Sequence, residues 1–273
     1  MPDISVCVPV YNGEVYLKVC LESVVAQAGV NLELIIGDDN STDRSLEIVA
    51  EIQSKFPEIK WKIIRHASRL GMAGNWNACV EAATGNFIKV MGQDDLLYPG
   101  CLIKQLSLLE NHPDVGLCAS SADILSARGR KIMKRKRKFR EGILDGDEFI
   151  SKCIARAFNF IGEPVTAMFR KSDIAGVGHF DASMSYFIDL DMWMRLLKGK
   201  NFAFIDESLC GFRIHRGGAS FSLQNKGYKE FLRLEQKVNL EPPLSSFRQS
   251  TRKFLAARDS VVRLAAYNIL GVL

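Results

Sequence analysis

The sequence contains no Cys-x-x-Cys pair, although it has seven cysteines among its 273 residues. These cysteines are scattered through apolar segments and their number is odd, which argues against a disulfide framework or a zinc site. Reduced, buried cysteines are typical of cytosolic proteins, so we expect a cytoplasmic location. No run approaches 18 apolar residues, and acidic Asp3 lies near the first residue. We therefore expect neither a transmembrane helix nor a signal peptide.

Acidic residues are absent from one long segment, residues 128–140, which holds nine basic side chains and is named the basic tract below. The whole chain has 36 Lys and Arg against 31 Asp and Glu, and outside the tract the balance is 27 to 31. Such a run is usually a solvated loop, but it can also attract polyanions such as anionic lipid head groups. Phe139 is its only aromatic residue. Without a recognisable binding module, we expect no nucleic-acid partner.

Strands and helices alternate through residues 1–112. Short apolar runs rich in β-branched residues predict strands at 4–10, 32–37, 60–66 and 86–91. Helical spacing predicts helices between them, including one at 74–85, and Ser41 or Thr42 is expected to cap the second helix. This alternation predicts an α/β fold in which crossover helices flank a mostly parallel sheet.

The pattern changes in the second half, residues 113–225, which we assign to the same domain as the first half. Apolar patterning predicts a strand at 115–125 and a helix at 145–158, and the segment 212–220 is predicted to be a loop. Residues 226–273 are expected to form a helical C-terminal extension. Within it, 250–270 forms a basic amphipathic pattern that suits either a membrane surface or the domain itself.

Polar residues follow three predicted strands of the first half. Asn12 follows the first, Asp38 and Asp39 follow the second, and Asp94 and Asp95 follow the fourth. In open α/β sheets, ligands bind outside the carboxyl ends of the strands. Because these ends share one edge of the sheet, the sequence predicts a joint site there. Paired aspartates repel each other unless a cation lies between them, although capping of the next helix is the simpler alternative.

Eight motifs, in this order, resemble those of the family 2 nucleotide-sugar glycosyltransferases. They are VPVYNGE, IIGDDNSTDRS, GMAGNWNACVEAATGNFIKVMGQDD, LLYPG, MFRKS, VGHFD, DLDMWMRL and FRIHRGGAS. The resemblance implies a GT-A fold with a Rossmann-like sheet. It also implies inverting transfer of a sugar from a nucleoside-diphosphate donor, commonly UDP-linked, to a hydroxyl group. Two positions depart from the usual pattern: Gly92 and Gln93 precede the aspartate pair, and Ile188 replaces a glutamate before Asp189.

The resemblance assigns Asp94, and Asp95 in support, to a site for Mg²⁺ or Mn²⁺. Both ions suit oxygen ligands and phosphate co-ligands, and either would stabilise a departing diphosphate. It further implies that His215 binds the metal or a phosphate, and that Arg213 and Arg216 bind the diphosphate from a closing loop. A packing or surface role is the alternative for His215.

The nucleotide would lie against Asp39, which accepts a hydrogen bond from the base in the family. A base without that donor would leave the carboxylate unpaired. The resemblance extends the nucleotide-binding set to Pro9, Tyr11, Asn12, Arg69, Asn75 and Gln93. For Asp39 the alternative is a helix cap, and for Arg69 it is a solvated side chain.

Asp189 is implied as the general base that takes the proton of the acceptor hydroxyl. Asp191 is expected to be structural, and for both the alternative is an acidic residue that complements the helix dipole. The acceptor is expected to be a glycan or lipid-linked glycan at the cytoplasmic face. Two rivals stay open. One is a sugar nucleotidyltransferase. Such enzymes usually have an N-terminal loop rich in Gly, Arg and Lys, and VPVYNGE does not resemble that loop. The other is a catalytically weak glycan- or polyanion-binding protein, suggested by Gly92, Ile188 and the basic tract.

Overall fold

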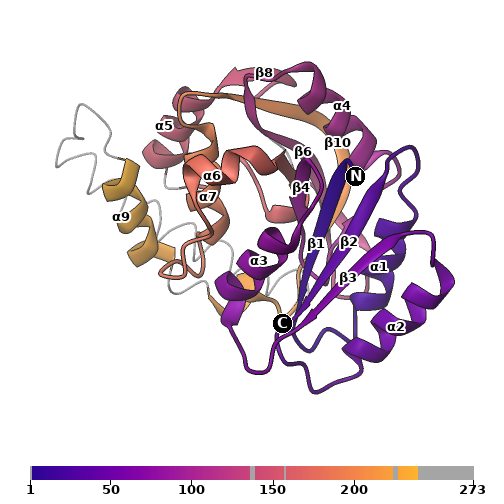
Figure 1. Cartoon of the computed structure of the whole chain (residues 1–273). Helices are drawn as coiled ribbons and strands as arrows, with labels where there is room; N and C mark the ends of the chain where they lie inside the picture. The colour runs from indigo at the N-terminus through magenta and orange to yellow at the C-terminus, as the bar shows by residue number, and fades with distance from the viewer. Residues whose placement is uncertain (1, 136–138, 157, 224–226, 239–273) are drawn as a thin grey trace.

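A computed structural model describes residues 2–135, 139–156, 158–223 and 227–238. A central sheet takes strands from both halves of the chain, and helices cover its two faces (Figure 1). The strand order is β3-β2-β1-β4-β9-β6-β10-β5, with β7 paired to β6 and β8 paired to β10. The predicted α/β fold, in which helices flank a central sheet, is therefore confirmed. The amphipathic segment 250–270 lies outside the described residues.

The first half forms the parallel side of the sheet. Its strands are β1 (Ile4–Val10), β2 (Leu32–Asp38), β3 (Lys60–Arg65) and β4 (Phe87–Val90), and each adjacent pair is parallel. Its helices are α1 (Leu17–Val25), α2 (Ser45–Lys55), α3 (Gly71–Ala82) and α4 (Cys101–Asn111), with the short strand β5 (Leu96–Leu97) before α4. The alternation of strands and helices predicted from the sequence is confirmed here.

Side chains alternate between two cores because successive residues of a strand point to opposite faces. Cys7 and Ile35 pack with α3 in one core. Val6 and Leu34 pack with α1 and α2 in the other. Both faces of these strands are buried, which explains why they are continuous apolar runs rather than alternating ones.

The second half adds both parallel and antiparallel strands to the same sheet. The strands are β6 (Val115–Leu125), β7 (Lys131–Lys134), β8 (Gly142–Asp145), β9 (Ala167–Arg170) and β10 (Asn201–Arg213). The helices are α5 (Gly146–Arg156), η1 (Pro164–Thr166), η2 (Lys171–Asp173), α6 (Ile174–Val177), α7 (Ile188–Leu197), α8 (Ala219–Ser222) and α9 (Gly227–Val238). β6 and β10 are parallel, whereas β9 is antiparallel to both β4 and β6. The strand β9 thus joins the two halves into one sheet.

Three local predictions are wrong. α3 begins at Gly71 and ends at Ala82, so it lies three residues before the predicted helix at both ends. Neither Ser41 nor Thr42 caps α2: the Ser41 hydroxyl accepts a hydrogen bond from the Asn12 N–H at 3.0 Å instead. The predicted loop at 212–220 begins only after Arg213, which ends β10.

The described part of the basic tract is only partly a solvated loop, because Arg128 and Arg130 are exposed in a turn and a strand follows them. Its residues 131–134 form β7, in which Lys131 pairs with Asp123 at 2.8 Å and Lys134 pairs with Asp206 at 3.0 Å. Phe139 packs against Phe149 and other aromatic rings of one core. The tract is therefore attached to the sheet at both ends by ion pairs and by an aromatic side chain.

Candidate active site

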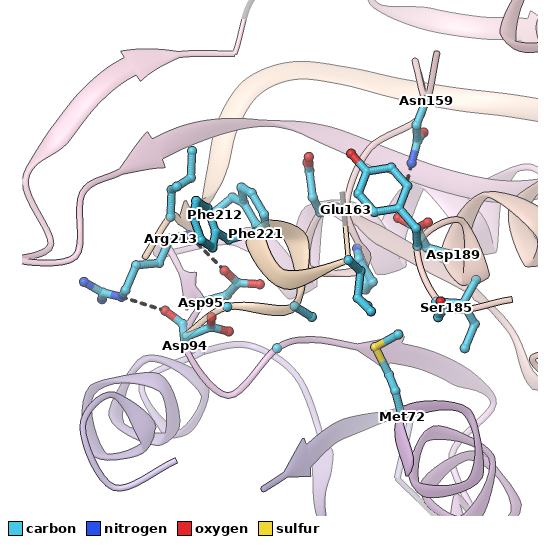
Figure 2. A pocket seen from close by; sticks show the side chains of 18 of the residues that line it. Met72, Asp94, Asp95, Asn159, Glu163, Ser185, Asp189, Phe212, Arg213 and Phe221 are labelled. Atoms are coloured by element: carbon cyan, nitrogen blue, oxygen red, sulfur yellow. Dashed lines mark hydrogen bonds between the residues drawn. The ribbon is translucent and has the colours of Figure 1, made fainter. Parts of the chain in front are cut away.

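One pocket opens at the carboxyl end of β4 and brings together segments that are far apart in the sequence (Figure 2). The residues after β4 and the end of β10 form one end, and the loop before α7 forms the other. Its lining includes five residues predicted from the sequence: Asp94, Asp95, Asp189, Arg213 and His215. Groups for binding a leaving group and for taking a proton thus share one pocket.

The two aspartates after β4 have different partners. Asp94 Oδ2 lies 2.7 Å from His215 Nε2. Asp95 Oδ1 accepts a hydrogen bond from the Arg213 backbone N–H at 3.0 Å, while Arg213 Nε donates to the Asp94 carbonyl at 2.8 Å (Figure 2). Burial, followed by the charge of Asp94, raises the pKa of Asp95 well above its ordinary value. The end of β10 therefore holds both aspartates in place.

The capping alternative for this pair does not hold. α4 begins at Cys101 and is preceded by Gly100 with φ of 81°, and no side chain caps its first turn. The aspartates therefore have no role at the start of the helix that follows them. Their contacts are with Arg213 and His215 at the same end of the pocket instead.

The residues at this end fit a divalent cation only in part. Among the described residues, no group of three or more His, Cys, Asp or Glu side chains is arranged to hold a metal ion. The Asp95 side chain is buried and already accepts the Arg213 N–H, so it is a supporting group rather than an open ligand. Asp94 offers a hard carboxylate oxygen, with His215 beside it. Phosphate oxygens and water would have to complete the shell, as Mg²⁺ commonly requires.

The predicted nucleotide-binding residues gather beside this pocket, at the ends of β1 and β2. The Gln93 side chain accepts from the Tyr11 N–H at 2.9 Å and donates to the Tyr11 carbonyl at 3.0 Å. The Arg69 guanidinium lies 3.6 Å from the centre of the Tyr11 ring. Gln93 therefore ties the residue after β1 to the segment after β4, and the exposed Tyr11 ring lies there with a cation over it.

Asp39 holds the start of α3. Its two carboxylate oxygens accept hydrogen bonds from the Leu70 and Gly71 N–H groups at 2.6 and 3.0 Å. The side chain is almost completely buried, and Arg69 Nε lies 3.9 Å away. Each carboxylate oxygen has a second lone pair, so these bonds are compatible with a further donor. Contact with a nucleotide base stays a prediction.

Asn12 and Asn75, two other residues of the predicted nucleotide-binding set, form hydrogen bonds within the protein. Asn12 has φ of 47°, and its Oδ1 accepts from the Thr42 N–H at 2.9 Å. The buried Asn75 donates from Nδ2 to the Gly37 and Val10 carbonyls at 2.7 and 3.4 Å. Its Oδ1 faces His66 Nε2 at 3.1 Å, so every polar atom of the Asn75 amide has a protein partner. Asn75 thus holds the strand ends, and its contact with a nucleotide stays a prediction.

Pro9 and Arg216 do not line the pocket either. Pro9 lies inside β1, opposite Gly37 of β2. Arg216 is exposed in the loop after β10, whereas Arg213 of the same motif is buried. Of the two predicted diphosphate-binding arginines, the structure brings only Arg213 into the pocket.

Asp189 lies in the first turn of α7 at the other end of the pocket. Its side chain is mostly buried, with Oδ1 accepting from the Leu190 N–H at 2.7 Å and Oδ2 accepting from Asn159 Nδ2 at 3.2 Å. Asp191, by contrast, forms ion pairs with Arg195 at 2.7 Å and with Lys237 at 2.8 Å. The two aspartates therefore differ in the way that the sequence suggests: Asp191 is structural, and Asp189 faces the pocket.

The pocket residues that sequence reasoning missed include Arg135, Asn159 and Glu163. It also missed Glu230 of α9, which accepts hydrogen bonds from the loop that leads to Asp189. The basic tract marked Arg135 by its charge, but nothing in the sequence placed that residue in a pocket. The partners of Glu163 and Glu230 are distant in the sequence, so no local spacing indicated them.

The model of the family described as glycosyl transferase family 2 matches residues 5–175, which is more than half of the chain. The chain belongs to glycosyl transferase family 2. The match includes Asp39, Asp94 and Asp95, whereas Asp189 and the end of β10 lie beyond it. Family membership therefore bears directly on the nucleotide half, and the rest of the pocket is argued from its geometry.

Two curated relatives illustrate the similarity. The uncharacterized protein MT1568 of Mycobacterium tuberculosis is 31% identical over 216 residues, which are 76% of this chain and 66% of that protein. A Campylobacter jejuni protein named GalNAc(5)-diNAcBac-PP-undecaprenol beta-1,3-glucosyltransferase is 28% identical over 269 residues, 98% of this chain and 82% of its own length. This chain thus spans slightly less than two thirds of the first relative.

Two solved structures share the fold. S. aureus TarS 1-349 in complex with UDP-GlcNAc matches with a TM-score of 0.69 and 19% identity over 88% of this chain and 68% of that one. The mannosyltransferase PcManGT from Pyrobaculum calidifontis, in complex with GDP-Man and Mn2+, matches with a TM-score of 0.61 and 16% identity over 100% of this chain and 81% of that one. At these identities the likeness establishes the fold alone.

Proposed function

We propose that this chain is an inverting glycosyltransferase that moves a sugar from a nucleoside-diphosphate donor to an acceptor hydroxyl. One observation supports this most strongly. A single pocket has Asp94, Arg213 and His215 at one end and the carboxylate of Asp189 at the other. The first group can bind a departing diphosphate, and the second can take a proton. Direct displacement at an anomeric carbon requires both functions on opposite sides of the sugar.

The reaction follows from these positions. The acceptor hydroxyl lies against Asp189, which takes its proton as the oxygen attacks the anomeric carbon from the face opposite the diphosphate. Asn159 holds one Asp189 oxygen and the Leu190 N–H holds the other, so the carboxylate has a fixed direction. Arg213 and His215 lie where negative charge develops on the leaving group. A divalent ion on Asp94, when bound, would supply further Lewis-acid stabilisation of that group.

The donor is proposed to be UDP-linked, with GDP-linked sugars as the alternative. Support comes from the family and from the two solved neighbours, which bind UDP-GlcNAc and GDP-Man with Mn2+, respectively. In this chain the base would lie near Asp39 and the Tyr11 ring, and the diphosphate would lie beside Asp94. Mg²⁺ or Mn²⁺ is the proposed cofactor.

The acceptor is proposed to be a glycan or a lipid-linked glycan at the cytoplasmic face of a membrane. The name of the Campylobacter jejuni relative supports this choice by analogy. Arg128 and Arg130 of the basic tract are exposed, and Met133 is 54% exposed beside them. Exposed cations next to an apolar side chain suit peripheral contact with anionic lipids. No helix among the described residues has both the length and the apolar character that crossing a membrane requires.

The two rival functions are less well supported. A sugar nucleotidyltransferase would not account for the buried carboxylate of Asp189 at the far end of the pocket. A glycan- or polyanion-binding protein would draw on the basic tract, but Lys131 and Lys134 are ion-paired with the protein's own aspartates. Pairing of these two lysines reduces the charge that the tract offers to a polyanion, which favours the transferase.

Calorimetric titration with UDP, GDP, dTDP and CDP, each with and without Mn²⁺, tests the proposal. We expect the wild type to bind one nucleotide preferentially and more tightly with the metal. Asp94→Ala should remove the metal dependence while the thermal midpoint stays close to that of the wild type. If no nucleotide binds at millimolar concentration, the proposed donor site is wrong and the binding-protein alternative takes its place.

A further inference from the structure

A second charged pair lines the pocket and has no part in the transfer described above. The Arg135 guanidinium forms an ion pair with Glu163 Oε1. The other carboxylate oxygen, Oε2, is buried and has no hydrogen-bond partner among the described residues. Both side chains lie in the pocket lining, and they are 18% and 17% exposed (Figure 2 labels Glu163).

The segment that carries Glu163 is held rigidly. Asn159 Oδ1 accepts from the Gly162 N–H at 2.9 Å, and the Gly162 carbonyl accepts from Asn159 Nδ2 and Trp193 Nε1, each at 3.1 Å. The Glu163 carbonyl in turn accepts from the Thr166 N–H at 2.9 Å. Because these bonds fix the backbone on both sides of Glu163, its carboxylate is presented by a braced turn.

The same turn contacts the proposed base. Asn159 Nδ2 donates to both the Gly162 carbonyl and Asp189 Oδ2. Glu163 follows Gly162 directly, so Glu163 and Asp189 are anchored to one short segment. A sugar bound at Glu163 would therefore lie near the reacting groups. Arg135 arrives from the basic tract, on the other side of the pair.

The chemistry of the pair selects its ligand. A buried acceptor oxygen without a donor is unfavourable, so a ligand that donates a hydrogen bond to Glu163 Oε2 would relieve a cost of the free protein. The pair as a whole is neutral, which disfavours a ligand of either charge. It offers a carboxylate acceptor beside guanidinium donors. Two adjacent hydroxyl groups of a neutral sugar ring match this arrangement, with one donating to Glu163 and one accepting from Arg135.

We propose that Glu163 and Arg135 form a subsite that binds adjacent hydroxyl groups of a neutral sugar ring in the pocket. The ring is either the transferred sugar of the donor or the acceptor sugar, since both would have the same chemistry. This inference rests on the proposed function, because it assumes that a sugar enters the pocket.

Two variants test the subsite from its two sides, Glu163→Gln and Arg135→Met. Glu148→Gln is the matched control, because Glu148 forms an exposed ion pair with Lys152 on α5. Calorimetry compares UDP with UDP-GlcNAc and UDP-glucose, and GDP with GDP-mannose. Saturation-transfer NMR then detects binding of a panel of neutral methyl glycosides to the protein saturated with nucleotide. Thermal midpoints of unfolding show whether each variant is folded. The two substituted residues lie on separate segments of the chain.

We expect both variants to bind the free nucleotides as the wild type does. If the ring belongs to the donor, their affinity for the sugar nucleotide should fall about tenfold, which is the size expected for a lost hydrogen bond to a charged group. If the ring belongs to the acceptor, the sugar nucleotide should bind normally and the methyl glycoside signal should be lost. Glu148→Gln should change neither.

Unchanged sugar-nucleotide affinity together with an unchanged glycoside signal would overturn the subsite and leave the proposed function standing. Failure of the wild type to bind any nucleotide or sugar nucleotide is a different result. It would contradict the proposed function, and the subsite would fall with it.

Discussion

Glu230 of α9 provides the sharpest test of how the proposed base, Asp189, is held. Its buried carboxylate accepts four hydrogen bonds from the loop before α7: from the Ser185 N–H and hydroxyl at 3.0 and 2.6 Å, from the Tyr186 N–H at 2.7 Å, and from the Phe187 N–H at 3.0 Å. Ile188 and Asp189 follow directly in α7. One carboxylate from another helix thus satisfies the backbone donors at the start of α7, which carries Asp189.

We expect Glu230→Ala to lower the free energy of unfolding by about 3–5 kcal/mol at neutral pH. Each buried donor left without an acceptor costs roughly 1–3 kcal/mol, and the costs are not additive within one network. Glu230→Gln keeps the shape of the side chain and one acceptor oxygen. The lost charge should therefore lower the free energy of unfolding by about 2 kcal/mol. Urea unfolding measures both values, provided that the slopes with denaturant match. Lys229→Gln, at an exposed position of the same helix, is the control.

The stability that Glu230 contributes depends on pH with a definite sign. Burial opposes ionisation of Glu230, but the hydrogen bonds from Ser185, Phe187 and Tyr186 outweigh it and lower the pKa of the carboxyl. A lowered pKa contributes stability above the unfolded value of about 4.3, and that contribution is lost as the pH falls through the folded pKa. The stability difference between the wild type and Glu230→Gln should therefore shrink in acid. Equal urea midpoints of the wild type and Glu230→Ala at pH 7 would refute the reasoning.

Three further predictions concern the leaving-group end, the packing and the surface. His215→Ala should weaken nucleoside-diphosphate binding about tenfold by calorimetry, and unchanged affinity would exclude His215 from the site. Gly116→Ala should destabilise the protein by about 2–4 kcal/mol in urea unfolding, because an added Cβ would lie 2.2 Å from the Leu196 carbonyl oxygen; an unchanged midpoint would contradict this packing. The double change Arg128→Gln and Arg130→Gln should reduce co-sedimentation with vesicles of anionic lipid but not with neutral vesicles, and equal sedimentation of variant and wild type would rule out this surface as the contact.

The first half of the fold was predictable from the sequence because its elements follow local patterns. Buried parallel strands appear as continuous apolar runs. Asp38 ends β2, and the polar residues Asn12 and Asp94 come shortly after β1 and β4. The capping prediction failed because a tertiary contact outweighed a local one. Ser41 has the chemistry of a cap, but its hydroxyl serves the Asn12 N–H across the strand ends.

The less predictable features depend on partners far away in the chain. The strand in the basic tract requires Asp123 and Asp206 to neutralise its lysines, and nothing near the tract indicates them. Glu230 lies more than 40 residues from its partners in the loop before α7. The motif resemblance found Asp189 and Arg213, but it carried no information on which side chains hold them.

Donor turnover by the wild type and Asp189→Asn tests the central claim most directly. The measurement is nucleotide release from UDP-GlcNAc, UDP-glucose and GDP-mannose in the presence of Mn²⁺, with calorimetric binding of the same donors alongside. We expect Asp189→Asn to bind the preferred donor as the wild type does and to release nucleotide about 10²–10⁴-fold more slowly, the range for loss of a general base. Nucleotide release at the wild-type rate would contradict the assignment of Asp189 as the base and the account of the pocket that depends on it.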